Sequence, residues 1–112
     1  MSTKDEVVES LKKMVGKMED PKYQSRFADF NKTLQFIFTD NEEAICHIVF
    51  QGGTATLKDG KADSAELEIT TTTEAIMAIM DGTLSPTRAF MGGKVKAKGP
   101  MNDLLKLQAL MK

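Results

Sequence analysis

The sequence predicts an α+β fold with five strands in one sheet and about five helices covering one side of it. Apolar residues recur at three- and four-residue spacing up to about residue 31 and then alternate in short runs, so the period changes from helical to extended. The strand-like runs also follow one another without helices between them, which favours α+β over an alternating βαβ arrangement. At 112 residues the chain has room for one domain, and we expect residues 1–112 to form it.

The N-terminal segment is predicted to be helical. Residues 4–18 place one apolar stripe on a helix whose opposite side carries Lys and Glu. The stripe consists of Val7, Val8, Leu11, Met14, Val15 and Met18. Asp20 and Pro21 end this helix or begin the next one, and residues 22–31 form a weaker helical stretch.

Three strands of an antiparallel meander are predicted next. They are rich in β-branched and aromatic residues, and Asp40-Asn41 and Gly52-Gly53 mark the turns between them. The predicted strands are residues 33–39, 43–51 and 54–58. A fourth strand is predicted at residues 65–70, where strict alternation points Leu67 and Ile69 inward.

The C-terminal segment adds two helices, a short strand and a last helix. The helices are predicted at residues 73–81, at residues 85–91 and from residue 99 onward, and the strand at residues 93–98. Gly82 ends the first of these helices. Ser85 caps the second, with Pro86 at its first position, and Gly99-Pro100 begin the last.

Composition and charge limit the classes of partner and the cellular location that we expect. The net charge of −1 gives no overall field for nucleic acid, so we expect no nucleic-acid partner. The single cysteine, Cys46, cannot form an intrachain disulfide, which favours a reducing compartment. The first residues lack an apolar signal region, and no apolar run approaches the roughly 18 residues that a membrane span needs. We therefore expect a cytoplasmic location.

The chain offers little reaction chemistry. His47 and Cys46 are neighbours on one predicted strand, so their side chains point to opposite faces and cannot act as a pair. Glu66 and Glu68 share an outward face, with nothing to suggest a pocket around them. No phosphate-binding loop, dinucleotide motif or metal-ligand cluster occurs. We expect no catalytic residue, no metal, no cofactor and no enzyme activity.

Flexible apolar side chains gather in the last third of the chain. Five of the eight methionines fall between Met77 and Met111, and Met suits surfaces that adapt to varied apolar shapes. The helix at residues 73–81 is apolar on nearly all sides, so either protein buries both sides or one side faces a cavity. This pattern favours a protein that holds an apolar ligand over one that transforms it.

The terminal helix carries an apolar arc with one amide inside it. The arc consists of Met101, Leu104, Leu105, Leu107 and Met111. Gln108 falls near its middle, and an unpaired buried amide costs roughly 1–3 kcal/mol. Two interpretations stay open: Gln108 bonds the polar end of a lipid or a cavity water, or it bonds a nearby backbone group.

Several short blocks carry a family resemblance through their order and spacing. They are Asp59-Gly60-Lys61-Ala62-Asp63, Ala75-Ile-Met-Ala-Ile-Met80, Ala89-Phe90, Gly93-Lys94-Val95-Lys96 and Lys106-Leu107-Gln108-Ala109-Leu110. With these blocks the chain resembles, from Leu34 onward, the sterol carrier protein 2 family of small intracellular lipid-binding domains. The resemblance implies a mixed five-stranded sheet whose helices enclose an apolar tunnel. It also implies loosely specific binding of fatty acids, fatty acyl-CoA, sterols or similar lipids.

The resemblance also suggests which residues form the lipid site. The predicted tunnel residues are Ile76, Met77, Met80, Phe90, Met91, Met101, Leu104, Leu105, Gln108 and Met111. Phe90 and Met91 precede Gly92-Gly93 and are expected on a mobile lip. We expect non-enzymatic lipid binding or transfer. The alternative is an accessory protein-interaction domain whose apolar groove receives a partner segment. The identity of the lipid and the oligomeric state stay open.

Basic residues surround the last predicted strand. Lys94, Lys96 and Lys98 alternate along it, and Arg88 lies nearby. They could meet a carboxylate, a coenzyme A phosphate or an anionic membrane in transient contact. Lysines on edge strands also prevent sheet-to-sheet pairing, and we favour that simpler interpretation.

Overall fold

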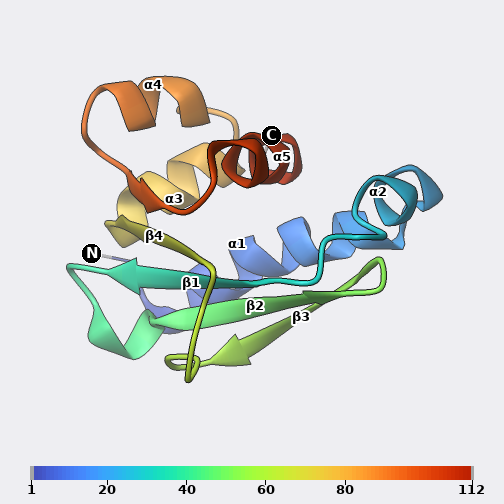
Figure 1. Ribbon diagram of the computed structural model, residues 1–112. Helices are drawn as coiled ribbons and strands as arrows, with labels where there is room; N and C mark the ends of the chain where they lie inside the picture. Colours follow the sequence, from blue (N-terminus) through green and yellow to red (C-terminus); the bar gives the residue numbers. More distant parts are fainter. Residues whose placement is uncertain (1, 112) are drawn as a thin grey trace.

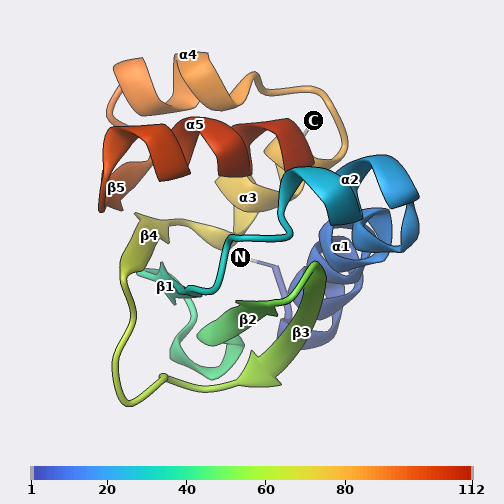
Figure 2. The same cartoon turned by 45° about the vertical axis from the view of Figure 1, so that its right-hand side comes forward.

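A mixed five-stranded sheet carries its helices on one face, as Figures 1 and 2 show. The computed structural model describes residues 2–111. Its strands are β1 (Thr33–Phe38), β2 (Cys46–Gln51), β3 (Thr54–Asp59), β4 (Leu67–Thr71) and β5 (Lys96–Lys98). Its α-helices are α1 (Lys4–Gly16), α2 (Pro21–Arg26), α3 (Thr73–Met80), α4 (Pro86–Met91) and α5 (Met101–Leu110). The predicted α+β fold with a five-stranded mixed sheet is confirmed.

The strand register gathers apolar side chains on one face of the sheet. The spatial order is β3-β2-β1-β4-β5, with β1 and β4 parallel and every other pair antiparallel. Leu34 of β1 lies opposite Ile48 of β2 and Leu67 of β4, and all three are fully buried. Since side chains alternate along a strand, one face of the sheet becomes the floor of the core.

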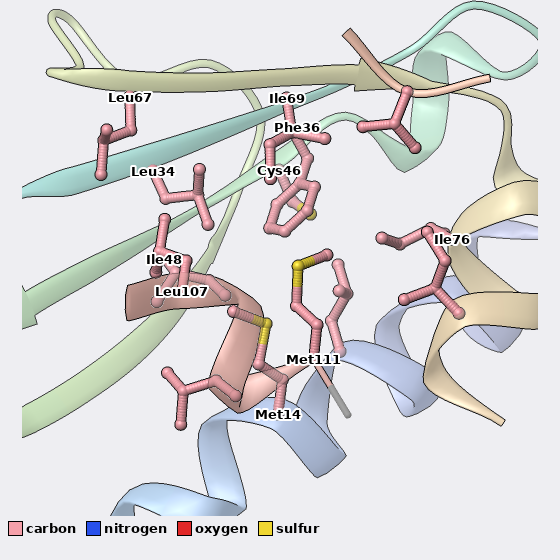
Figure 3. Packing of buried hydrophobic residues seen from close by; sticks show 14 of the residues in the cluster. Met14, Leu34, Phe36, Cys46, Ile48, Leu67, Ile69, Ile76, Leu107 and Met111 are labelled. Carbon is pink, nitrogen blue, oxygen red and sulfur yellow. The ribbon is translucent and has the colours of Figure 1, made fainter. Parts of the chain in front are cut away.

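Helices α1 and α5 close the core above that floor. A capping box between Thr3 and Glu6 starts α1, which buries Leu11 and Met14 completely. Figure 3 shows Met14 from α1 and Met111, which follows α5, reaching into the same apolar space below the sheet residues. The apolar stripe predicted for residues 4–18 is thus the buried side of α1, except that Met18 lies in the 3₁₀ turn of residues 17–19 that follows the helix.

Strands β2 and β5 both start three residues later than predicted, because local hydrogen bonds compete with the sheet, and the other strand boundaries differ by no more than two residues. Residues 42–44 form a 3₁₀ helix in place of the start of β2, since the Asn41 side chain accepts the Glu43 amide at 3.1 Å. β5 begins at Lys96 and not at residue 93. The amides of Lys94 and Val95 donate to the Ala89 carbonyl at 2.9 and 3.2 Å, so this segment closes α4. The second helix also ends early, at Arg26.

A hydrogen-bonded joint fixes the start of α3 beside β1. The Thr73 amide and hydroxyl donate to the two Asp40 carboxylate oxygens at 2.9 and 2.6 Å. The Thr73 hydroxyl also accepts the Ser2 amide at 3.0 Å, and the Asn41 amide donates to the Ser2 carbonyl. The joint ties the chain start and the β1–β2 turn to α3, and α3 leads directly from β4 towards the helices of the candidate site.

Candidate functional site

An apolar pocket of about 160 Å³ lies between the β4–β5 side of the sheet and the helices α3, α4 and α5. Thirteen residues line it: Ile69, Ile79, Pro86, Thr87, Phe90, Val95, Ala97, Met101, Leu104, Leu105, Leu107, Gln108 and Met111. Only Thr87 and Gln108 among them carry polar side chains. The pocket therefore offers apolar burial with a single polar spot.

The floor of the pocket comes from the strand pair β4–β5. Ile69 lies opposite Ala97 in this antiparallel pair, so both point to the same face of the sheet. Ala97 has a small side chain, which leaves space above the sheet. Together with Val95, these residues form an apolar surface that faces the helices.

One glycine allows α5 to approach the sheet closely. Gly99 has φ of +135°, and a Cβ atom at this position would overlap Cδ2 of Leu67 and lie 3.2 Å from the Glu66 carbonyl oxygen. Only a residue without a side chain fits both the backbone angle and the gap. Gly99 therefore sets the distance between α5 and β4, and with it one dimension of the pocket.

The two polar side chains of the pocket satisfy each other. The Gln108 amide donates to the Thr87 hydroxyl, which links α5 to α4. The partner of Gln108 is thus a side chain on the neighbouring helix, whereas the sequence left open a lipid or water on one side and a nearby backbone group on the other. Within residues 2–111, no buried side-chain nitrogen or oxygen lacks a hydrogen-bond partner. An apolar ligand could therefore enter the pocket without stranding a buried polar group.

The predicted tunnel residues divide into two groups. Six line the pocket: Phe90, Met101, Leu104, Leu105, Gln108 and Met111. The other four lie outside its walls. Ile76 is fully buried in the core, and Met77 accepts a hydrogen bond from the Ser10 hydroxyl of α1 at 3.1 Å. Met80 packs half-buried against the core, and Met91 is 80% exposed.

Seven lining residues were not among those predicted. They are Ile69, Ile79, Pro86, Thr87, Val95, Ala97 and Leu107. The alternation of the last two strands carried a usable signal. It pointed Ile69 inward, and Val95 and Ala97 stand between the alternating lysines and so share the opposite face. Thr87 carried no such signal, because it pairs with Gln108 of another helix, 21 residues further along the chain.

Exposed apolar side chains gather at the mouth of the pocket. We call Phe90, Met91, Met101 and Leu105 the α4–α5 rim; their exposed fractions are 47%, 80%, 59% and 57%. These are the large hydrophobic side chains that stand exposed in the described chain, and three of them also line the pocket. Figure 2 shows α4 and α5 side by side on the part of the molecule farthest from β3. The pocket therefore opens to solvent through an apolar border.

A second hollow lies on the other side of α3. It is larger, about 560 Å³, but its walls include Thr70, Thr71 and Thr72 together with Lys94 and Lys96. A cavity with this lining provides little apolar contact, so we take the smaller pocket as the candidate lipid site.

The nucleophilic and basic side chains of β2 lie away from the pocket. Burial, and next the nearby Asp59 carboxylate, raise the pKa of the Cys46 thiol to about 12, so the thiol stays protonated and unreactive. His47 points to the other face, where its Nδ1 lies 2.9 Å from the Gly60 carbonyl oxygen. In the described part of the chain, no group of three His, Cys, Asp or Glu side chains could hold a metal ion.

The fold and the pocket together define a small α+β domain built around an apolar site, and sequence comparison identifies its family. The chain belongs to the SCP-2 sterol transfer family, whose model matches residues 11–112. This membership confirms the resemblance drawn from the sequence blocks. Among residues 2–111, none of the helices has the length and apolar character needed to cross a bilayer.

Individual relatives share either local sequence or the fold. Human hydroxysteroid dehydrogenase-like protein 2 is 42% identical over 50 residues, which are 45% of this chain and 12% of that protein. Palmitated SCP2L2 from Aedes aegypti has a TM-score of 0.68 at 17% identity, over 99% of this chain and 95% of that one. The inverting sec-alkylsulfatase Pisa1 from Pseudomonas sp. has a TM-score of 0.66 at 20% identity. The match covers 78% of this chain but 14% of the sulfatase, so the shared part is a fraction of that enzyme.

Proposed function

We propose that the protein binds a lipid in the pocket below α4 and α5 and carries it without changing it chemically. The ligand class is fatty acids, fatty acyl-CoA, sterols or similar molecules with a large apolar part. The observation that carries the proposal is the lining of the pocket, where eleven of thirteen side chains are apolar and the two polar ones bond each other. The palmitated relative from Aedes aegypti, which shares the fold, supports an acyl chain as one such ligand.

Burial of an acyl chain supplies enough free energy for useful affinity. Each methylene removed from water contributes about 0.8 kcal/mol, so about ten of them contribute on the order of 8 kcal/mol before the costs of association. Micromolar dissociation constants correspond to about 8 kcal/mol of net binding free energy, so further contacts, including headgroup contacts, must offset those costs. Because apolar burial is not directional, we expect loose specificity among lipids of similar length.

The proposal requires the pocket to widen. Its volume of about 160 Å³ lies below the roughly 300–1,000 Å³ typical of small-molecule sites. Gly82 and Gly93 flank α4 with φ of +85° and +78°. These glycines can absorb backbone rotation, so α4 is the element that we expect to move outward when a lipid enters.

A role without catalysis fits the side chains near the pocket. Thr87 and Gln108 do not exchange protons near neutral pH, and neither has an acid or base among the residues that line the pocket with it. The cytoplasmic location expected from the sequence remains part of the proposal. Cys46 is a free and buried thiol, which suits a reducing compartment.

The test is lipid identification together with a substitution that fills the pocket. Native mass spectrometry of the purified protein, followed by solvent extraction, reports any retained lipid, and titration with a pyrene-labelled fatty acid reports affinity. Ala97→Phe places a ring in the space above the β4–β5 floor, and we expect at least a tenfold loss of affinity. Ala65→Phe adds the same ring at an exposed position outside the pocket and serves as the control. Equal affinity in a well-folded Ala97→Phe protein would place the ligand elsewhere.

A protein-interaction role is the second candidate, and the exposed α4–α5 rim is the observation that favours it. In this case the pocket would receive an apolar side chain of a partner. Purified protein free of lipid that also fails to bind the pyrene-labelled fatty acid would favour this role over lipid binding.

A further inference from the structure

Charge is unevenly distributed between the two parts of the chain. Residues 82–112 carry six basic and one acidic side chain, whereas residues 1–81 carry nine basic and fifteen acidic ones. The single acid of the C-terminal part, Asp103, is paired with Lys32. The nearly neutral whole therefore consists of a negative part and a positive part. The positive part contains α4, β5 and α5.

The positive side chains lie beside the α4–α5 rim. Arg88 precedes Met91 by three residues on α4, so the two side chains share one side of the helix. Lys94 follows in the loop that closes α4, and both basic side chains are exposed. Neither makes an ion pair within the described residues, although Lys94 lines the second hollow together with Glu74. Exposed apolar and unpaired basic side chains are thus adjacent on one surface.

We propose that the α4–α5 rim docks on the surface of an anionic lipid bilayer, an inference that rests on the proposed lipid-binding function. Met91 and Phe90 enter the boundary between headgroups and acyl chains. Arg88 and Lys94 lie against the anionic headgroups. In this orientation the mouth of the pocket faces the bilayer, so an acyl chain passes between membrane and protein without crossing bulk water.

An anionic bilayer complements both the apolar and the basic side chains of this surface. A second copy of the chain, or nucleic acid, complements only one of the two kinds. A two-fold contact between copies through the rim would bring each Arg88 and Lys94 towards their equivalents, and like charges repel. Nucleic acid would attract the basic groups, but the rim side chains of Met and Leu gain nothing against sugar and phosphate. An anionic membrane supplies negative charge at its surface and apolar volume directly below.

The first experiment is co-sedimentation of the full chain with vesicles. One set consists of phosphatidylcholine alone, and the other of equal parts phosphatidylcholine and phosphatidylserine. We expect binding to the second set only, weakened by added salt as the charges are screened. Each basic residue near a membrane surface changes affinity about fivefold, so Arg88→Gln with Lys94→Gln should lower it by about 25-fold. Lys58→Gln with Lys61→Gln removes the same charge near β3, and this control should bind like the unchanged protein.

The apolar part of the proposal has its own pair of variants. Met91 does not line the pocket, so its substitution tests docking without altering the lipid site. Met91→Ser should lower vesicle affinity by about tenfold, and Met91→Leu should retain it. Equal vesicle binding by Met91→Ser and the unchanged protein would overturn the proposed insertion.

Measurements without vesicles separate this inference from the proposed function. The Arg88, Lys94 and Met91 variants should bind the pyrene-labelled fatty acid with unchanged affinity in solution. If the unchanged protein ignores anionic vesicles but binds the fatty acid, docking is wrong and lipid binding stands. If it binds vesicles but no fatty acid, the lipid site is wrong and the surface is a membrane contact alone. A Met91-dependent dimer in analytical ultracentrifugation, with no vesicle binding, would assign the rim to a second copy.

Discussion

Single residues decide whether the pocket can exist, and Gly99 is the clearest of them. Its φ of +135° and the overlap that a Cβ atom would make with Leu67 restrict this position to glycine. From the sequence, Gly99 is predicted to begin the last helix together with Pro100, whereas α5 begins at Met101 and Gly99 lies in the loop before it. Its close contact with Leu67 joins the loop between β5 and α5 to the start of β4, and local spacing carries no information on such a contact.

We expect Gly99→Ala to destabilise the protein. The new methyl group meets Leu67 and the backbone is held at an unfavourable φ, and each effect costs roughly 1–3 kcal/mol. Thermal and urea unfolding should report the loss. Gly16→Ala is the control, because a Cβ there meets nothing within 4 Å. If both substitutions had the same small effect, α5 would not be seated against β4 as described.

Because of Cys46, the free energy of unfolding should decrease at alkaline pH. Its pKa is raised from 9.0 to about 12 in the folded protein by burial and then by Asp59, so the unfolded chain loses this proton first. The stabilisation is complete below pH 9 and is lost as pH rises from about 9 towards 12, by up to about 1.4 kcal/mol per pH unit. Urea unfolding between these values should show a steeper decline for the unchanged protein than for Cys46→Ala.

Helices and strands follow the sequence wherever one clear period is present. The stripe of α1 and the alternation around Leu67 and Ile69 predicted both elements and the side of each that is buried. The same method could not orient α3, because apolar residues surround that helix and any rotation of it buries some of them. Ile76 consequently faces the core and Ile79 the pocket, and only packing against α1 and α5 decides between them.

The joint between Asp40 and Thr73 should anchor α3. Thr73→Val removes a hydroxyl that donates to a carboxylate and accepts an amide, and we expect a loss of about 1–3 kcal/mol in unfolding free energy. Thr56→Val, at an exposed position of β3, should stay within about 0.5 kcal/mol. Chemical denaturation of both variants tests this.

The same joint between Asp40 and Thr73 predicts that the stability of the fold decreases at acidic pH. Burial acts to raise the pKa of Asp40, but hydrogen bonds from Thr73 outweigh it and lower the pKa below 3.8. The carboxylate therefore stabilises the fold above about pH 4, and this contribution is lost as pH falls further. Asp40→Asn should show a weaker loss of stability between neutral pH and pH 3. An identical acid profile for the two proteins would mean that the joint does not form.

At the scale of the whole molecule, pocket and core are continuous. Ile69, Ile79, Val95, Leu107 and Met111 belong to the buried core and also line the pocket. No layer of side chains separates the two, so a ligand would contact the residues that hold the sheet and helices together.

Ligand binding should therefore raise the melting temperature directly. At a hundredfold excess over its dissociation constant, a ligand that binds only the folded state adds about 2.7 kcal/mol to the unfolding free energy. Differential scanning fluorimetry with palmitate should show an increase for the unchanged protein and none for Ala97→Phe. An equal increase for both would indicate palmitate binding at some other surface.

The shared residues of core and pocket also bear on how long each molecule survives in a cell. Proteases cut the small open fraction of a protein, and this fraction falls as the folded state gains free energy. An empty molecule is the less stable form and should be degraded sooner than a loaded one. The amount of this protein would then follow the supply of its lipid, with no separate regulator needed to match the two.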